Sequence, residues 1–215
     1  MIEQILPPGI YCSTLTDLSA PFELWPDEKA LLAKATEKRR RDFSAGRACA
    51  RNSLQQMGIQ GISLPADEKR MPLWPPGIIG SITHCSDYCA AAVTRQSVYA
   101  SLGIDAERDR SIDDRLMNYI SLPEERTHLL SLPKNLNWRL LLFSAKESIY
   151  KLYYPLRLRR LRFHDVAISF DPTGPCFQAS VASESENRPL QSQQFQGNFL
   201  VAGDLYLTAA WQSAE

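Results

Sequence analysis

The chain has 215 residues, of which 44% are hydrophobic, enough to form the core of one ordinary domain or of two small ones. Lysine and arginine together number 24, as do aspartate and glutamate, so overall charge gives no argument for binding nucleic acid or a membrane surface. The five scattered cysteines show no zinc-ligand spacing, and we interpret them as reduced thiols in a cytoplasmic protein. The sequence shows neither a secretion signal nor an apolar run near the ~20 residues of a membrane span.

The first hundred residues predict a mixture of strands and helices. In chain order we expect a strand, a polar helix, a second helix, a proline-rich loop and a strand of small residues, at 10–15, 30–41, 42–57, 63–79 and 88–93. Gly58 is a natural stop for the second helix. The polar residues 80–86 form a boundary before the second strand.

Basic residues bracket the two predicted helices. Arg39 and Arg40 lie in the first, whereas Arg47 and Arg51 lie one turn apart on the second. These arginines form either a solvated basic face or an anion site, because a guanidinium fork matches phosphate oxygens. His84, close to Ser81, is either a structural histidine or a ligand contact.

A pair of acids follows the apolar residues 102–104. If the strand continues, its two-residue period places Asp105 and Glu107 on the same side. Two carboxylates in this position repel each other unless a divalent cation lies between them, and oxygen ligands favour Mg²⁺ or Mn²⁺. The alternative is a charged strand end that enters a polar loop.

The second half predicts three helices followed by strands. We expect the helices at 112–120, 121–130 and 138–154, with Pro155 ending the last, and the strands at 166–170, 177–181 and 199–210. We expect a mobile polar loop at 183–198. The lack of regular strand–helix–strand alternation favours an α+β fold.

The long helix carries one unusual acid. At 3.6 residues per turn Glu147 shares a face with Phe143, Tyr150 and Tyr154, and this face looks core-directed. A carboxylate in such a place needs a partner or a metal. The alternative is an exposed pair with Lys151, four residues on, worth about 0.3–0.5 kcal/mol.

Three segments in fixed order carry a resemblance to a known family: 80–84 (Gly-Ser-Ile-Thr-His), 103–107 (Gly-Ile-Asp-Ala-Glu) and 143–151 (Phe-Ser-Ala-Lys-Glu-Ser-Ile-Tyr-Lys). Together they closely resemble the signature of the 4′-phosphopantetheinyl transferases. Segments 39–47 and 72–75 resemble the branch of enterobactin synthase component D, close to the Sfp type. The resemblance implies two similar α+β halves related by a pseudo-two-fold, here 1–100 and 101–215, with coenzyme A in the cleft between them.

The resemblance also implies roles for individual residues. Asp105, Glu107 and Glu147 would hold Mg²⁺, and Arg47 with Arg39 or Arg40 would hold the 3′-phosphate of coenzyme A. The remaining contacts to the nucleotide and its pyrophosphate would come from Lys69 or Arg70, Ser81, His84, Lys146 and Lys151. Arg160 stands where relatives often place aromatic or apolar residues around the pantetheine arm.

The activity implied is transfer of the phosphopantetheine arm of coenzyme A to a serine of an apo carrier protein, by a cytoplasmic monomer. Glu147 is the expected base, and Lys151 and His84 are expected to assist the leaving 3′,5′-adenosine bisphosphate. Residues 108–122 are the expected docking region for the carrier. The alternatives are a non-catalytic coenzyme A or nucleotide-binding module and a nucleic-acid-binding protein.

Overall fold

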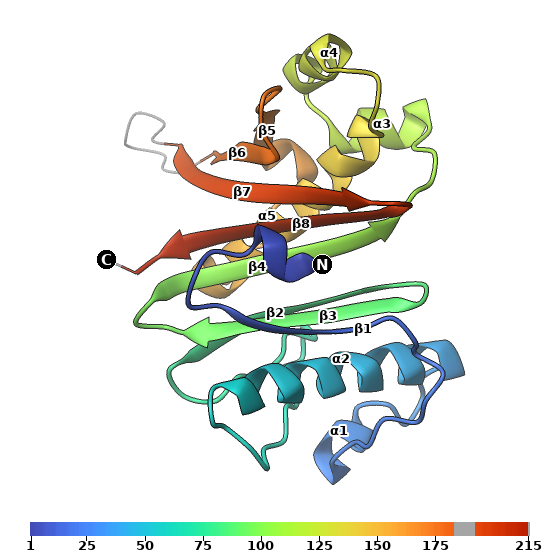
Figure 1. The fold of residues 1–215 in the computed structure, drawn as a ribbon, viewed down its shortest axis with the longest axis vertical. Coiled ribbons are helices and arrows are strands. Elements are labelled where there is room, and N and C mark those ends of the chain that lie inside the picture. Colours follow the sequence, from blue (N-terminus) through green and yellow to red (C-terminus); the bar gives the residue numbers. More distant parts are fainter. Residues whose placement is uncertain (183–191, 215) are drawn as a thin grey trace.

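The computed structural model describes residues 1–182 and 192–214, which fold into helices and two antiparallel sheets (Figure 1). The α+β fold class is confirmed. In this part of the chain, the first sheet has the order β1-β3-β2 and the second the order β4-β8-β7-β6-β5. The strands are β1 (Tyr11–Leu15), β2 (Ile78–Cys85), β3 (Tyr88–Arg95), β4 (Tyr99–Arg108), β5 (Val166–Phe170), β6 (Cys176–Val181), β7 (Gln193–Ala202) and β8 (Leu205–Ser213). The helices are η1 (Ile2–Ile5), α1 (Pro26–Ala30), α2 (Glu37–Gln56), α3 (Asp114–Ile120), α4 (Pro123–Ser131), α5 (Trp138–Arg157) and η2 (Phe163–Asp165).

One long helix packs against each sheet (Figure 1). Helix α2 covers β1 and β3 with a surface of small residues, among them Ala45, Cys49 and Ala50, all fully buried. Helix α5 crosses β4 and β8 and buries its aliphatic side chains against the second sheet. The first residues of the chain join the second sheet, because Ile2 and Ile5 pack with Leu205 and Leu207.

Gly103 allows α5 to approach β4 closely. A Cβ atom at this position would lie 1.9 Å from the carbonyl oxygen of Ser148, so no other residue fits without moving the helix. Ser101, two residues earlier, donates a hydrogen bond of 2.6 Å to the carbonyl oxygen of Leu152. These contacts hold the middle of α5 directly beside the acidic end of β4.

The two sheets meet along β2 and β4 through side-chain hydroxyls. Oγ of Ser81 accepts a hydrogen bond from the Ile104 amide at 3.1 Å, and Oγ1 of Thr83 accepts one from the Ala106 amide at 3.0 Å. Alternate residues of a strand share a face, so Ser81 and Thr83 both reach β4. The segment 80–84 therefore joins the two halves, in addition to any contact with a ligand.

Several sequence-based boundaries are wrong. The two helices predicted at 30–41 and 42–57 are one helix, α2, which begins after Thr36 because its Oγ1 accepts a hydrogen bond from the Arg39 amide. The chain between α1 and α2 forms turns. The segment 80–86, expected as a boundary, lies mostly in β2.

Two further corrections concern the second half. Helix α5 continues past Pro155 to Arg157, and its last turn closes with a 2.8 Å hydrogen bond from the Leu158 amide to the Tyr154 carbonyl oxygen. The strand predicted at 199–210 is a hairpin of β7 and β8 that turns at Gly203, whose φ is +63°. Strand β7 takes up 193–198 of the predicted loop, and the remainder at 183–191 lies outside the described residues.

Candidate active site

A cavity of about 440 Å³ opens between the two halves. Its walls come from α2, the proline-rich loop, β2 and the last turns of α5. The lining includes Arg39, Arg47, Lys69, Arg70, His84 and Lys151, with Asp42 as its carboxylate. Aromatic side chains complete the wall, namely Phe43, Trp74, Tyr150 and Tyr154. This cationic and aromatic lining suits a ligand that carries phosphates and a flat ring.

Arg47 is fixed in the wall of this cavity although only 4% of it is exposed. Its Nε donates a 2.5 Å hydrogen bond to the carbonyl oxygen of Leu64, and its guanidinium lies 4.2 Å from the centre of the Phe43 ring. Burial lowers the pKa of Arg47 to about 10, and the nearby Arg39 contributes in the same direction. A buried cation with a second cation close by favours a bound anion.

The other predicted basic residues divide into two groups. Arg39, Lys69 and Arg70 line the cavity, and Nζ of Lys69 lies 5.7 Å from the centre of the Tyr154 ring on the opposite wall. Arg40, by contrast, is exposed and donates to the carbonyl oxygens of Ala35 and Ala33. Of the two, only Arg39 is placed in the lining of this cavity.

A tight turn presents the basic pair of the proline-rich loop. Oδ1 of Asp67 accepts hydrogen bonds from the amides of Lys69 and Met71, at 2.9 and 2.8 Å. Arg70 adopts φ +71°, in the left-handed region. The turn directs both Lys69 and Arg70 into the cavity, so the geometry leaves both as candidates.

Asp105 lies at the centre of a hydrogen-bonded group beside the cavity. Its Oδ1 accepts from Nζ of Lys151 at 2.7 Å and from Oγ1 of Thr83 at 3.3 Å, while its Oδ2 accepts from Oγ of Ser144 at 2.9 Å. The Glu147–Lys151 pair considered from the sequence is replaced by this Asp105–Lys151 pair. Ser144 and Thr83 were not predicted as site residues, and only their place within the segments 80–84 and 143–151 indicated them.

Glu107 and Glu147 lie near Asp105 and respond to its charge. Burial raises the pKa of each carboxyl group, and repulsion from Asp105 raises it further. Arg110 opposes this effect on the pKa of Glu107, as Lys151 does on that of Glu147. The three carboxylates therefore form an unfavourable concentration of negative charge that a divalent cation would relieve.

The acids fit a hard cation by their chemistry. All three offer carboxylate oxygens, the ligands that Mg²⁺ prefers, and the ammonium of Lys151 already pairs with one of them. Among the described residues the structure contains no group of three acidic, histidine or cysteine side chains close enough to be a preformed metal centre. These side chains would have to rearrange to hold such an ion.

His84 and Ser81 lie at the β2 wall of the cavity. Nδ1 of His84 is 4.0 Å from Oδ2 of Asp42, a carboxylate that the sequence did not single out. Burial lowers the pKa of His84 despite that neighbour, which favours the neutral imidazole. Oγ of Ser81 accepts from the Ile104 amide, so its own proton remains available as a donor to a ligand.

Lys146 is not part of this site, and the prediction that it contacts pyrophosphate is wrong. Its side chain is 1% exposed, and its ammonium forms a 2.7 Å ion pair with Glu125. The other two hydrogen bonds go to the carbonyl oxygens of Phe163 and Val166. An ammonium has three donors, and all three are used within the fold.

The aromatic face of α5 lines cavities and also borders the core. Tyr150 and Tyr154 stack with ring centres 5.8 Å apart and line the main cavity. Tyr150 and Glu147 also line a second cavity of about 220 Å³ with Leu161 and Phe163. The core-directed interpretation holds for Tyr154, which is buried, and in part for Phe143, which packs against the core. Glu147 and Tyr150 are half-buried, and the fully buried face of α5 is formed by Leu141, Ala145, Ile149 and Leu152.

The sequence is similar to known proteins over nearly its whole length. Residues 27–94 match the 4′-phosphopantetheinyl transferase N-terminal domain, and residues 101–209 match the 4′-phosphopantetheinyl transferase superfamily. The chain is 37% identical to 4′-phosphopantetheinyl transferase Npt of Nocardia iowensis, covering 97% of this chain and 98% of that protein. It is 41% identical to PptT of Mycobacterium tuberculosis, over 69% of this chain and 67% of that protein. Enterobactin synthase component D of Salmonella typhimurium is 37% identical, over 60% and 55% of the two chains.

Proposed function

This chain belongs to the 4′-phosphopantetheinyl transferases, which transfer phosphopantetheine to carrier proteins, and we propose how its two halves divide that reaction. The observation that carries the proposal is the cavity between the halves, where basic residues of 1–100 face Tyr150, Lys151 and Tyr154 of α5. Lys151 pairs with Asp105 and so connects this cavity to the acidic end of β4. Residues 1–100 would bind the nucleotide of coenzyme A. Residues 101–215 would supply the acids and the chemistry.

The nucleotide binds in the cationic cavity. Arg47 and Arg39 receive the 3′-phosphate, because both line the cavity and Arg47 has a guanidinium locked by Leu64 and Phe43. Lys69 and Arg70, which line the cavity with Tyr154, contact the same nucleotide and cover it from the side of the proline-rich loop. The pantetheine arm passes Tyr150 into the second cavity, since Tyr150 lines both.

Asp105, Glu107 and Glu147 would hold Mg²⁺. When bound, Mg²⁺ would neutralise charge on the pyrophosphate oxygens as the transferred group moves. The fit rests on the carboxylate oxygens and on the upward pKa shifts of Glu107 and Glu147, caused by burial and by Asp105. Mn²⁺ offers the same ligand preference.

The serine hydroxyl of the carrier loses its proton to Glu147, whose pKa is raised by burial and which is therefore a better base than an exposed glutamate. The serine oxygen bonds to the β-phosphorus of coenzyme A while the bond to the bridging oxygen breaks. The leaving 3′,5′-adenosine bisphosphate takes up the developing charge. Lys151 and neutral His84 line this cavity. Both donate hydrogen bonds to the leaving bisphosphate.

The carriers are carrier domains of siderophore, nonribosomal peptide, polyketide or fatty acid synthesis. The similarity to enterobactin synthase component D supports the siderophore class. The protein works in the cytoplasm as a monomer; all five of its cysteines are free thiols, which suits a reducing compartment. No helix in the described parts of the chain has the length and apolar character needed to cross a bilayer.

One incubation tests the function. The protein is mixed with coenzyme A, Mg²⁺ and an apo carrier protein, and the carrier is weighed by mass spectrometry. We expect one phosphopantetheine arm per carrier and none when the acceptor serine is replaced by alanine. Coenzyme A binding without any added mass, on several unrelated carriers, would favour the non-catalytic module instead. Size-exclusion chromatography tests whether the protein is a monomer.

A further inference from the structure

A buried acid outside the lining of the cavity has no part in the reaction above. Glu28, in the short helix α1, is fully buried and touches neither coenzyme A's cavity nor the acids of β4. Its carboxylate receives four hydrogen bonds. They come from the Trp25 amide, the Leu64 amide and, twice, Nη1 of Arg51.

The Leu64 peptide links this acid to the cavity. Its amide donates to Oε1 of Glu28 at 2.9 Å, and its carbonyl oxygen accepts from Nε of Arg47 at 2.5 Å. Both polar groups of one buried residue are thus held, one by the acid and the other by the guanidinium. Glu28 fixes where the Leu64 carbonyl lies, and that carbonyl fixes the direction of the Arg47 fork.

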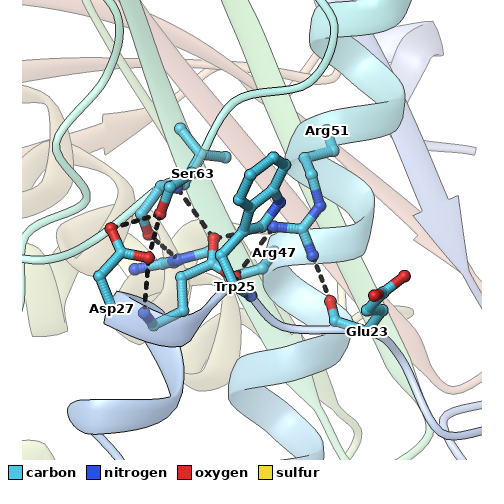
Figure 2. Close-up of polar contacts among 8 residues, drawn as sticks. Glu23, Trp25, Asp27, Arg47, Arg51 and Ser63 are labelled. Atoms are coloured by element: carbon cyan, nitrogen blue, oxygen red, sulfur yellow. Dashed lines mark hydrogen bonds and ion pairs between the residues drawn. The ribbon is translucent and has the colours of Figure 1, made fainter.

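Arg51 completes the arrangement. It pairs with Glu28 at 2.8 Å, and its Nη2 donates to the Glu23 carbonyl oxygen at 2.5 Å. Figure 2 shows Arg47 and Arg51 reaching from α2 toward the segments that carry Glu23, Asp27 and Ser63. Arg51 neutralises the Glu28 carboxylate, so this acid does not form an ion pair with Arg47. The guanidinium nitrogens of Arg47 other than Nε therefore stay available to a ligand. Within the described residues Arg47 has no carboxylate at ion-pair distance.

We propose that Glu28 is a positioning residue for the 3′-phosphate of coenzyme A, acting through the Leu64 peptide on Arg47. This rests on the proposed role of Arg47. A bound anion needs its donors preorganised, and outer partners set that orientation. The Glu28–Leu64–Arg47 chain thereby makes recognition of the 3′-phosphate depend on a side chain that never touches it.

The test compares two substrates. Glu28→Gln removes the carboxylate charge, which weakens the hydrogen bond from the Leu64 amide and abolishes the ion pair with Arg51. We expect the KM for coenzyme A to rise about tenfold, the scale of other outer-partner substitutions. The KM for 3′-dephospho-coenzyme A should stay within about twofold, because that substrate has no group for Arg47 to bind. In an Arg47→Ala background, Glu28→Gln should add nothing.

Controls separate the ways in which this could fail. Asp27→Asn weakens the contacts that Asp27 accepts from Oγ of Ser63 and from the Glu28 amide, on the exposed side of the same segment. It leaves the Glu28 carboxylate and its bonds to Leu64 and Arg51 in place, so it should not change the ratio of the two KM values. Glu28→Asp keeps a negative charge opposite Arg51, but its shorter side chain no longer reaches the Leu64 amide. It replaces Glu28→Gln if that variant does not fold. We expect the same rise in the KM for coenzyme A, with the KM for 3′-dephospho-coenzyme A unchanged.

Three outcomes would overturn the proposal. These are an equal rise in both KM values, an additive effect in the Arg47→Ala background, and the same selective loss in Asp27→Asn. If Arg47→Ala itself leaves the preference for coenzyme A unchanged, then the assignment of the 3′-phosphate to Arg47 fails, which is a separate result.

Discussion

Helix α5 presents two lysines five residues apart, and each forms a 2.7 Å ion pair with a carboxylate. Lys146 pairs with Glu125 in a sealed region where both side chains are almost fully buried. Lys151 pairs with Asp105 at the edge of the cavity and is 27% exposed. The distances are the same, yet the surroundings differ.

The difference lies in what remains unsatisfied. The Glu125 carboxylate also accepts hydrogen bonds from the amides of Leu122 and Ile168, so its region is complete within the fold. Beside Asp105, by contrast, Glu107 and Glu147 have pKa values raised by burial and by Asp105. An ion pair is therefore a poor indicator of function by itself, and unrelieved neighbouring charge is a better one.

The largest expected effect is on the rate of transfer, from a substitution in the acidic group beside Asp105. Glu147→Gln keeps the size of the side chain and removes the base and a metal ligand, so the transfer rate should fall by about 10²–10⁴-fold. Coenzyme A binding should largely survive, because the 3′-phosphate contacts Arg47 and Arg39 of the other half. Single-turnover transfer, followed by mass spectrometry, measures the rate, and Glu124→Gln on the exposed side of α4 is the control. Undiminished transfer would remove Glu147 from the mechanism.

Lys146→Met should act on stability instead. Removing one partner leaves Glu125 buried without its counter-charge, and such losses cost about 3–5 kcal/mol. The free energy of unfolding from urea titration should drop by that amount, while transfer per folded molecule stays near the wild-type rate. A large loss of activity with intact stability would return Lys146 to the site.

Lys151→Met should give the opposite pattern. Its ammonium lies between Asp105 and the cavity, so its loss removes a donor for the leaving group and should reduce kcat by about 10²–10³-fold. The unfolding midpoint should change less than for Lys146→Met, because the pair is partly exposed. Equal losses of stability in the two variants would break the distinction between the regions.

The smallest expected effect is a pH dependence. A carboxyl group whose pKa is raised in the folded protein binds protons more tightly there than in the unfolded chain. Folding is therefore favoured at low pH by these groups, and this contribution is lost as the pH rises through their raised pKa values. With chelator present, Glu107→Gln/Glu147→Gln should flatten the decline in unfolding free energy above about pH 4.5, the usual glutamate pKa.

Added Mg²⁺ should oppose the same decline in the unsubstituted protein and have no such effect on the double variant. Urea titrations at several pH values, with and without chelator, measure both effects. A steeper decline in the double variant than in the unsubstituted protein would show that these two acids are not the source.

The sequence by itself determined the elements that depend on local pattern. The strand period predicted that Asp105 and Glu107 share a side, and the apolar run 138–154 predicted α5 apart from its last turn. Family resemblance supplied the transferase activity, which the comparisons confirm. Local pattern failed to predict the turn at Gly203, because a single glycine is a weak turn signal inside a run of strand-forming residues.

Only the tertiary structure decided which charged side chains remain accessible to a ligand. Lys146 and Lys151 stand in the same helix with the same chemistry, and no local pattern separates them. Lys146 is enclosed because Glu125 comes from α4 and two carbonyl oxygens come from the segment before and at β5. Lys151 meets Asp105 because Gly103 lets β4 approach α5. Burial and partner geometry are set by contacts between distant segments, and they determine which charged groups remain available for a ligand.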